Sequence, residues 1–174
     1  SRYLKTLDYL GDFDVANHSY GGSPSFYVYG DVAKFEKSAE DGRGGLGTVN
    51  VKSAGNSNID GNGEALDASR FTVTVGALDA NGQVAYYSTY GAHLLVSAPA
   101  GSVTTDRLDS GPATYENNSW KWTGADNWNG GGLHYSEDYG YGMVNAFNAV
   151  RMAEVWSAFN PAPATSANEQ SVTS

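Results

Sequence analysis

Thr48-Val49-Asn50-Val51-Lys52-Ser53-Ala54-Gly55-Asn56 is the stretch of sequence that decides the fold. Its β-branched residues predict a strand over Thr48–Ala54. A helical pattern over Tyr27–Asp41 precedes it, and a strand-helix-strand order implies a right-handed crossover and a parallel sheet. Open α/β sheets bind ligands at the carboxyl ends of their strands, so we expect the Asn56 amide at that edge, where it could donate to a developing oxyanion. An ordinary exit from a strand into a turn explains Gly55-Asn56 equally well.

The rest of the chain continues this alternation of strands and helices. A buried strand is predicted for Asp14–Ser19, before the helix. β-branched or apolar runs predict two further strands, and apolar residues at helical spacing predict two further helices. These segments are the strands Thr72–Val75 and Leu94–Ser97 and the helices Arg2–Leu10 and Met143–Trp156. The fold class is therefore predicted to be α/β, with a parallel central sheet flanked by helices.

Four further blocks accompany Ser53-Ala54-Gly55-Asn56: Asp14-Val15-Ala16-Asn17-His18-Ser19-Tyr20-Gly21-Gly22, Thr72-Val73-Thr74-Val75-Gly76-Ala77, Val96-Ser97-Ala98-Pro99-Ala100-Gly101 and Tyr139-Gly140-Tyr141-Gly142-Met143-Val144-Asn145-Ala146. In this order, the blocks resemble the second half of a subtilisin-like serine protease domain, most closely that of the kexin and proprotein-convertase branch. The resemblance implies a partial subtilisin-like catalytic domain over residues 1–156. The Pro-, Ala-, Ser- and Thr-rich residues 157–174 are predicted to be a linker or a disordered tail.

The resemblance also implies a site that hydrolyses peptide bonds through an acyl-enzyme. Asn56 would be the donor to the oxyanion. An extended peptide substrate would pair with the chain in the manner of an added strand. The residues implied to bind this substrate are Ser19, Tyr20, Gly21, Gly22, Ala54 and Gly55. Gly21 and Gly22 suit the close approach of another backbone, although a loop after a strand has the same composition.

The catalytic triad of that family is missing from the sequence. No Gly-Thr-Ser turn is present, and a block of the family pattern is absent between Asp106 and Asp109. Too little chain precedes Phe13 to hold the family's Asp and His. Ser110 is a turn serine, and no spacing implies that a histidine activates it. We therefore expect the chain alone to be inactive, whether it is a degenerate relative, a fragment, or a sequence that omits residues, and the missing parts of a longer protease chain are a possible partner.

The three histidines have structural explanations that do not involve catalysis. His18 ends a strand, His93 enters one, and His134 lies in a Gly-rich loop. Each is therefore expected to serve structure rather than to act as a general base.

A Gly-rich acidic loop over Asn58–Asp67 has the composition of a calcium site. The resemblance places a calcium ion of the kexin-like proteases here, with Asp60 and Glu64 as the matching ligands. Thr89 stands where a third carboxylate is expected. A solvated acidic loop without a metal ion is the alternative.

The composition narrows the class of partner. The 174 residues include 19 acidic and 10 basic ones, for a formal net charge of −9, and no cysteine. Nucleic acids and anionic membranes would be repelled, and no apolar run is long enough to span a bilayer. These features and the resemblance predict a secreted or periplasmic protein that binds a peptide or protein substrate.

An aromatic cluster supports a function of another class. Its members lie among Gly and Asn and could form a stacking surface for a carbohydrate or a partner protein. The cluster comprises Trp120, Trp122, Trp128, Tyr135, Tyr139 and Tyr141. If these side chains form an exposed row, the chain is a binding module; if they cover one another, the cluster is packing.

Overall fold

The computed structural model describes residues 1–79, 81–100, 120–123 and 133–159. Four strands form one sheet in the order β1-β2-β3-β4, and every neighbouring pair is parallel. The strands are β1 (Val15–His18), β2 (Val49–Ser53), β3 (Val73–Leu78) and β4 (Val96–Pro99). The predicted α/β fold with a parallel central sheet is confirmed.

The register of the sheet brings the ends of β1 and β2 together. His18 pairs with Lys52, and Ser53 pairs with Val75 on the next strand. Because parallel strands share a direction, the residues that follow β1 and β2 leave the sheet side by side at its carboxyl edge. This edge is the site that the sequence predicts for ligand binding.

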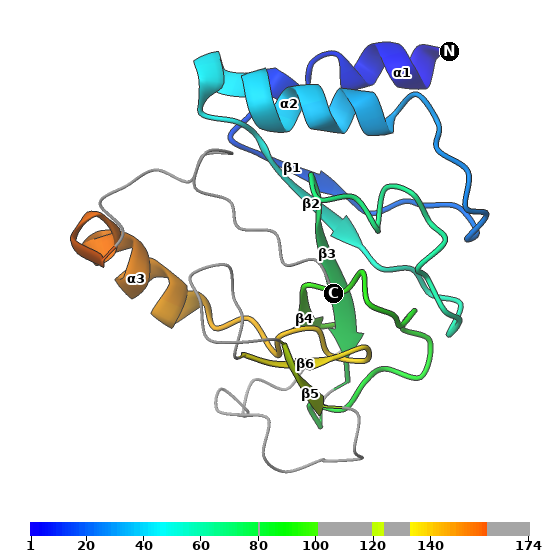
Figure 1. Cartoon of the computed structure of the whole chain (residues 1–174), viewed down its shortest axis with the longest axis vertical. Coiled ribbons are helices and arrows are strands. Elements are labelled where there is room, and N and C mark those ends of the chain that lie inside the picture. The colour runs from blue at the N-terminus through cyan, green and yellow to red at the C-terminus, as the bar shows by residue number, and fades with distance from the viewer. Residues whose placement is uncertain (80, 101–119, 124–132, 160–174) are drawn as a thin grey trace.

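One end of the molecule is formed by α1 (Arg2–Leu7), the short 3-10 helix η1 (Leu10–Asp12) and α2 (Val32–Gly45), as Figure 1 shows. Part of the hydrophobic core lies between these helices and the sheet. It is a cluster of four buried side chains, with Leu4, Ala16, Val32 and Phe71 packed against it. The four are Leu7, Leu10, Phe35 and Leu66.

Helix α2 begins later than the sequence predicts. Its N-cap is Asp31, whose carboxylate accepts a hydrogen bond from the Val32 amide, so the predicted start at Tyr27 is wrong. Side chains before the cap are exposed, including Tyr27 at 61 % and Val28 at 67 %. The predicted end of the helix at Asp41 agrees with the structure, because the dihedral angles leave the helical region at Gly42.

Strand β1 is at the edge of the described sheet and is not the buried strand that the sequence predicts. Its burial alternates, with His18 buried and Val15 59 % exposed. Only Val15 and Ala16 of the predicted strand are apolar, and such a mixed segment suits an edge strand better than a strand buried on both faces.

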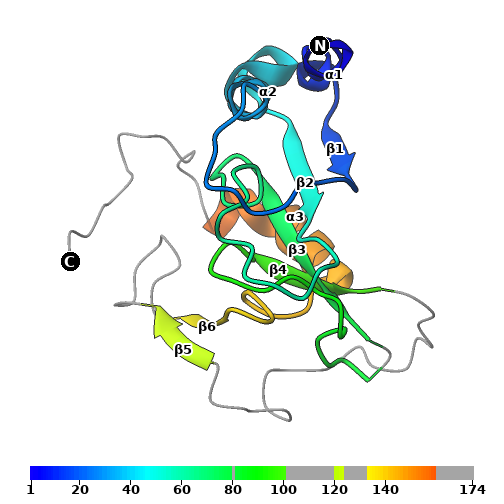
Figure 2. The same cartoon turned by 90° about the vertical axis from the view of Figure 1, so that its right-hand side faces the viewer.

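The C-terminal part contains an antiparallel hairpin that the sequence does not predict. It comprises β5 (Trp120–Thr123) and β6 (Leu133–Ser136), at the end of the molecule opposite α1 (Figures 1 and 2). Helix α3 (Ala146–Phe159) follows, so the predicted domain boundary at residue 156 falls inside a helix. The apolar residues that predict this helix are exposed, with Phe147 at 74 % and Val150 at 60 %.

None of the helices in the described ranges is long and apolar enough to cross a membrane. The predicted tail beyond residue 159 and the break between Asp106 and Asp109 lie outside the described residues.

Candidate functional site

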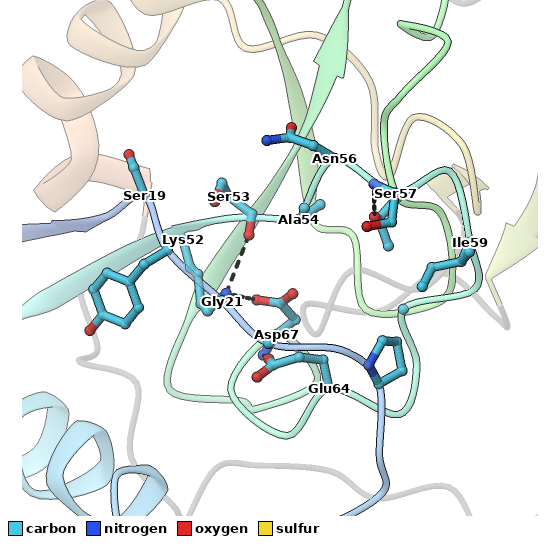
Figure 3. A pocket seen from close by; sticks show the side chains of 16 residues that line it. Ser19, Gly21, Lys52, Ser53, Ala54, Asn56, Ser57, Ile59, Glu64 and Asp67 are labelled. Carbon is cyan, nitrogen blue, oxygen red and sulfur yellow. Dashed lines mark hydrogen bonds and ion pairs between the residues drawn. The ribbon is translucent and has the colours of Figure 1, made fainter.

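A pocket of about 260 Å³ opens at the carboxyl edge of β1 and β2 (Figure 3). Its walls come from the segment after β1, from the end of β2 with the loop that follows, and from the connection before β3. Seven residues that the sequence assigns to substrate or oxyanion binding line it: Ser19, Tyr20, Gly21, Gly22, Ala54, Gly55 and Asn56. The structure thus brings together two predicted segments that are more than thirty positions apart in the chain.

Two glycines permit the close packing of these walls. A Cβ atom on Gly21 would lie 3.0 Å from Nζ of Lys52. Gly55 has φ +105, and a Cβ atom there would lie 2.9 Å from Oγ1 of Thr89. Side chains at these positions would push the walls apart, and at Gly55 the backbone conformation itself disfavours other residues.

Asn56 lies at the mouth of the pocket, three residues beyond the end of β2, and is exposed. Thr89 holds the loop that contains Asn56 through two hydrogen bonds. The amide of Thr89 donates to the carbonyl oxygen of Gly55 at 3.2 Å, and the hydroxyl of Thr89 accepts from the amide of Ser57 at 3.4 Å. The threonine that stands where a calcium ligand is expected therefore fixes the residues on either side of Asn56.

Sequence reasoning missed the ion pair between Lys52 and Asp67 in the pocket. Their side chains point toward one another in Figure 3, with Nζ 2.6 Å from Oδ1. The two side chains are only 1 % and 4 % exposed, respectively. Glu64 lies beside them, and its Oε2 accepts a hydrogen bond from the Asp67 amide at 2.7 Å. A lysine inside an apolar strand is a signal that could have indicated such a pair, because a buried ammonium requires a carboxylate.

The electrostatics of Asp67 follow from this burial. Removal from water raises the pKa of the Asp67 carboxyl, while the hydrogen bond and charge of Lys52 oppose the rise. Lys52 is thus the cation that favours the charged form of Asp67, and its loss would leave a buried carboxyl without a counter-ion.

Two histidines pack against the framework of the site. Nδ1 of His18 lies 2.9 Å from the hydroxyl oxygen of Tyr20, and Nε2 of His18 lies 3.4 Å from the side-chain oxygen of Asn50. His93 lies 3.4 Å from Asn62. Burial lowers the pKa of both histidines. Within the described residues neither ring bonds to a serine hydroxyl, and the side chain of His134 and all of Ser110 lie outside them.

The acidic loop is held by backbone hydrogen bonds to residues 87–90. Asp60 Oδ1 accepts from the Asn62 amide at 2.9 Å, and Asp60 does not line the pocket, whereas Glu64 does. Across the described ranges, no group of three or more acidic, histidine or cysteine side chains converges as a metal ion requires. These residues therefore fit calcium poorly, and a calcium ion bound by Asp60 and Glu64 stays a prediction.

Part of the aromatic cluster is used for packing. The Tyr135 hydroxyl donates to the Gly91 carbonyl oxygen at 3.1 Å, and the rings of Tyr135 and Tyr141 are 5.2 Å apart at their centroids. The alternative function depends on the burial of Trp120, Trp122 and Trp128, whose side chains lie outside the described residues.

The fold and the pocket define an α/β protein with a cavity at the carboxyl edge of a parallel sheet, and comparisons with known proteins identify the family. The sequence pattern described as the Subtilase family matches residues 5–138. The chain belongs to the subtilase family, and it is therefore a relative of serine proteases. Curated protein sequences provide no match.

Solved structures of bacterial proteases are similar to the chain. The Aeromonas sobria serine protease, solved in complex with its chaperone, has a TM-score of 0.61 and 16 % identity, and the match covers 87 % of this chain and 45 % of that one. A protease of Pseudoalteromonas arctica is 33 % identical over 52 % of this chain and 25 % of its own, with a TM-score of 0.45. The chain thus spans less than half the length of these structures.

Proposed function

We propose that this chain supplies the substrate-binding and oxyanion-stabilising part of a subtilase catalytic domain. The observation that carries the proposal is the pocket itself, where seven residues predicted from two distant segments line one cavity beside the exposed segment that follows β1. Solvent reaches the segment Ser19–Gly22, so a peptide could pair with it in extended form and place one side chain in the pocket.

Each wall of the pocket would have a distinct task in peptide-bond hydrolysis. The Asn56 amide would donate to the carbonyl oxygen that becomes negative in the tetrahedral intermediate. Removal of one such donor typically costs about 3 kcal/mol of transition-state stabilisation. The backbone around Gly21 and Gly55 would position the peptide so that this oxygen lies beside Asn56.

The nucleophile and the general base are not supplied by any motif of this sequence. We therefore propose that the chain binds peptides without turning them over, and that hydrolysis would require these groups from further protease segments. Binding and an oxyanion hole without a triad leave only a residual acceleration over water. Assignment to the kexin-like branch and a secreted or periplasmic location are finer proposals that rest on the resemblance of the sequence.

The proposal is tested by peptide titration followed with amide chemical shifts. An extended peptide that contains a basic residue should shift the amide signals of Ser19–Gly22 and Ala54–Asn56. In Gly21→Val the added side chain would meet Nζ of Lys52, and binding should be lost. Gly30→Ala is the matched control, because its Cβ atom would meet only Leu4 at 3.8 Å. Shifts elsewhere on the surface, or equal binding by both variants, would contradict a peptide site in this pocket.

A hydrolysis assay tests the second half of the proposal. The purified chain should release no product from a fluorogenic peptide. Turnover that Asn56→Ala reduces by about a hundredfold or more would show that a nucleophile is present after all.

A further inference from the structure

The pocket contains a cation that belongs to the protein itself. We propose that the ammonium of Lys52 is the permanent counter-ion of the pocket carboxylates, so that these residues take no divalent metal ion. The chain should accordingly fold with an intact pocket in the absence of calcium. This inference concerns the pocket of the proposed function, but its test measures stability and not peptide binding, so either proposal can fail alone.

The position of Lys52 follows from the pleat of β2. Burial alternates along this strand, so Asn50 and Lys52 share its buried face. Asn50 lies against α2, where its amide donates to the Ser38 hydroxyl at 3.0 Å. Lys52 is two residues nearer the carboxyl edge, beyond this contact, and its side chain reaches the wall formed by Gly21 and the connection that holds Asp67.

The ammonium lies where three segments meet. Besides Asp67, Nζ contacts the carbonyl oxygen of Ser53 at 3.4 Å, and it lies under the backbone of Gly21. Its partners thus come from the strand end and from the connection before β3, and the segment after β1 passes close to it at Gly21. A single cation thus links the end of β2 to the connection before β3, which is the structural role that a bound metal ion has in many proteins.

The charges of the pocket explain why a cation is needed. Asp67 is buried, and Glu64 is bonded to its backbone amide, so two carboxylates share a region with one ammonium. A buried carboxylate without a cation is strongly unfavourable. Thr89, the third residue of this region, has a hydroxyl that cannot neutralise charge. The Lys52 ammonium is therefore the group that compensates Asp67.

The ammonium also blocks a metal ion sterically. Calcium binds oxygen ligands at about 2.3–2.6 Å. Nζ of Lys52 already lies 2.6 Å from Oδ1 of Asp67, within the distance that the ion itself would occupy. A calcium ion on the same lone pair would have to displace the lysine, and an ion on another lone pair of Asp67 would be repelled by the charge of the ammonium.

Thermal unfolding followed by circular dichroism tests the inference. The purified chain should have the same Tm in EDTA as in excess CaCl2. Lys52→Met should lower the Tm in EDTA, and CaCl2 should restore part of the loss, because the vacated position exposes Asp67 and Glu64 to the ion. Lys37→Met, which removes the same charge from the exposed face of α2, is the matched control and should change neither value.

Two results would overturn the inference. In the first, CaCl2 raises the Tm of the unaltered chain but does not raise the Tm of Asp67→Asn. In the second, Lys52→Met and the unaltered chain have the same Tm in EDTA. If Lys52→Met does not fold, Lys52→Met with Asp67→Leu should fold and show no response to CaCl2; failure of this double variant to fold would show that the ion pair is not what makes Lys52 necessary.

Discussion

Helices α2 and α3 are each 14 residues long, and both are predicted from apolar residues at helical spacing, yet their surroundings differ completely. Phe35 of α2 is 0 % exposed, whereas Phe147 of α3 is 74 % exposed. Periodicity therefore predicts that a helix forms, but it does not reveal what the apolar face contacts. The two phenylalanines provide a direct measure of this difference.

The contacts of α2 explain its burial. It packs against η1 and the sheet, and the Phe35 ring lies 4.5 Å from the ring of His18 at the end of β1. Leu66, from the connection that also holds Asp67, belongs to the same core cluster. Packing around α2 thus supports both strands whose ends form the pocket.

The largest effect is expected for Phe35→Ala. Truncation of a fully buried phenylalanine typically lowers the free energy of unfolding by about 3–5 kcal/mol. Part of this loss is the transfer free energy of the ring, and part comes from the cavity that remains. Urea unfolding should show this decrease in the free energy of unfolding with little change in the m-value. A decrease below about 1 kcal/mol would mean that the core around α2 is loosely packed and would remove the contrast with α3.

Gly47→Ala should have the next largest effect, because it strains the turn between α2 and β2. Gly47 has φ +77, and a Cβ atom there would lie 2.2 Å from the carbonyl oxygen of Ala39. Backbone strain of this kind costs about 1–3 kcal/mol. Gly44→Ala is the control, since Gly44 has φ +69 and open space around its Cβ position. The same thermal and urea unfolding should show a smaller loss for Gly44→Ala; equal losses would show that the clash relaxes.

The difference between the helices also marks what the sequence can predict. Strand cores, the α/β order and the convergence of Ser19–Gly22 with Ala54–Asn56 follow from local pattern and from the rule that parallel strands end at one edge. Burial of β1 and the start of α2 were predicted wrongly, since both depend on neighbours and on the cap formed by Asp31. The pair of Lys52 and Asp67 joins a strand to a distant connection, and no short-range spacing encodes that contact.

The pH dependence of stability should report on His18, which packs against Phe35 of α2. Burial lowers the pKa of His18 below its ordinary value of 6.5, the hydrogen bond with Asn50 opposes this, and the charge of Lys52 adds to it. The unfolded chain therefore binds a proton more readily than the folded chain, and stability should fall as the pH falls through 6.5 toward the lower folded value.

Unfolding free energies measured between pH 8 and pH 5 would detect this fall. His18→Gln should show a shallower dependence than the unaltered chain, while His93→Gln should retain the contribution of His18. A steeper dependence in His18→Gln would contradict a neutral buried imidazole beside Phe35.

Phe147→Ala should have the smallest effect, although it is the same chemical change as Phe35→Ala. The side chain is 74 % exposed, so its truncation removes little buried area, and alanine is the better helix former. We expect a change within about 0.5 kcal/mol in either direction.

A loss of several kcal/mol in Phe147→Ala would show that the apolar face of α3 is buried in solution. A dependence of that loss on protein concentration would assign the cover to a second copy of the chain, because only association makes stability depend on concentration. Without that dependence, other residues of the same chain would have to bury this face. The two helices would then both be buried and would differ only in what they pack against.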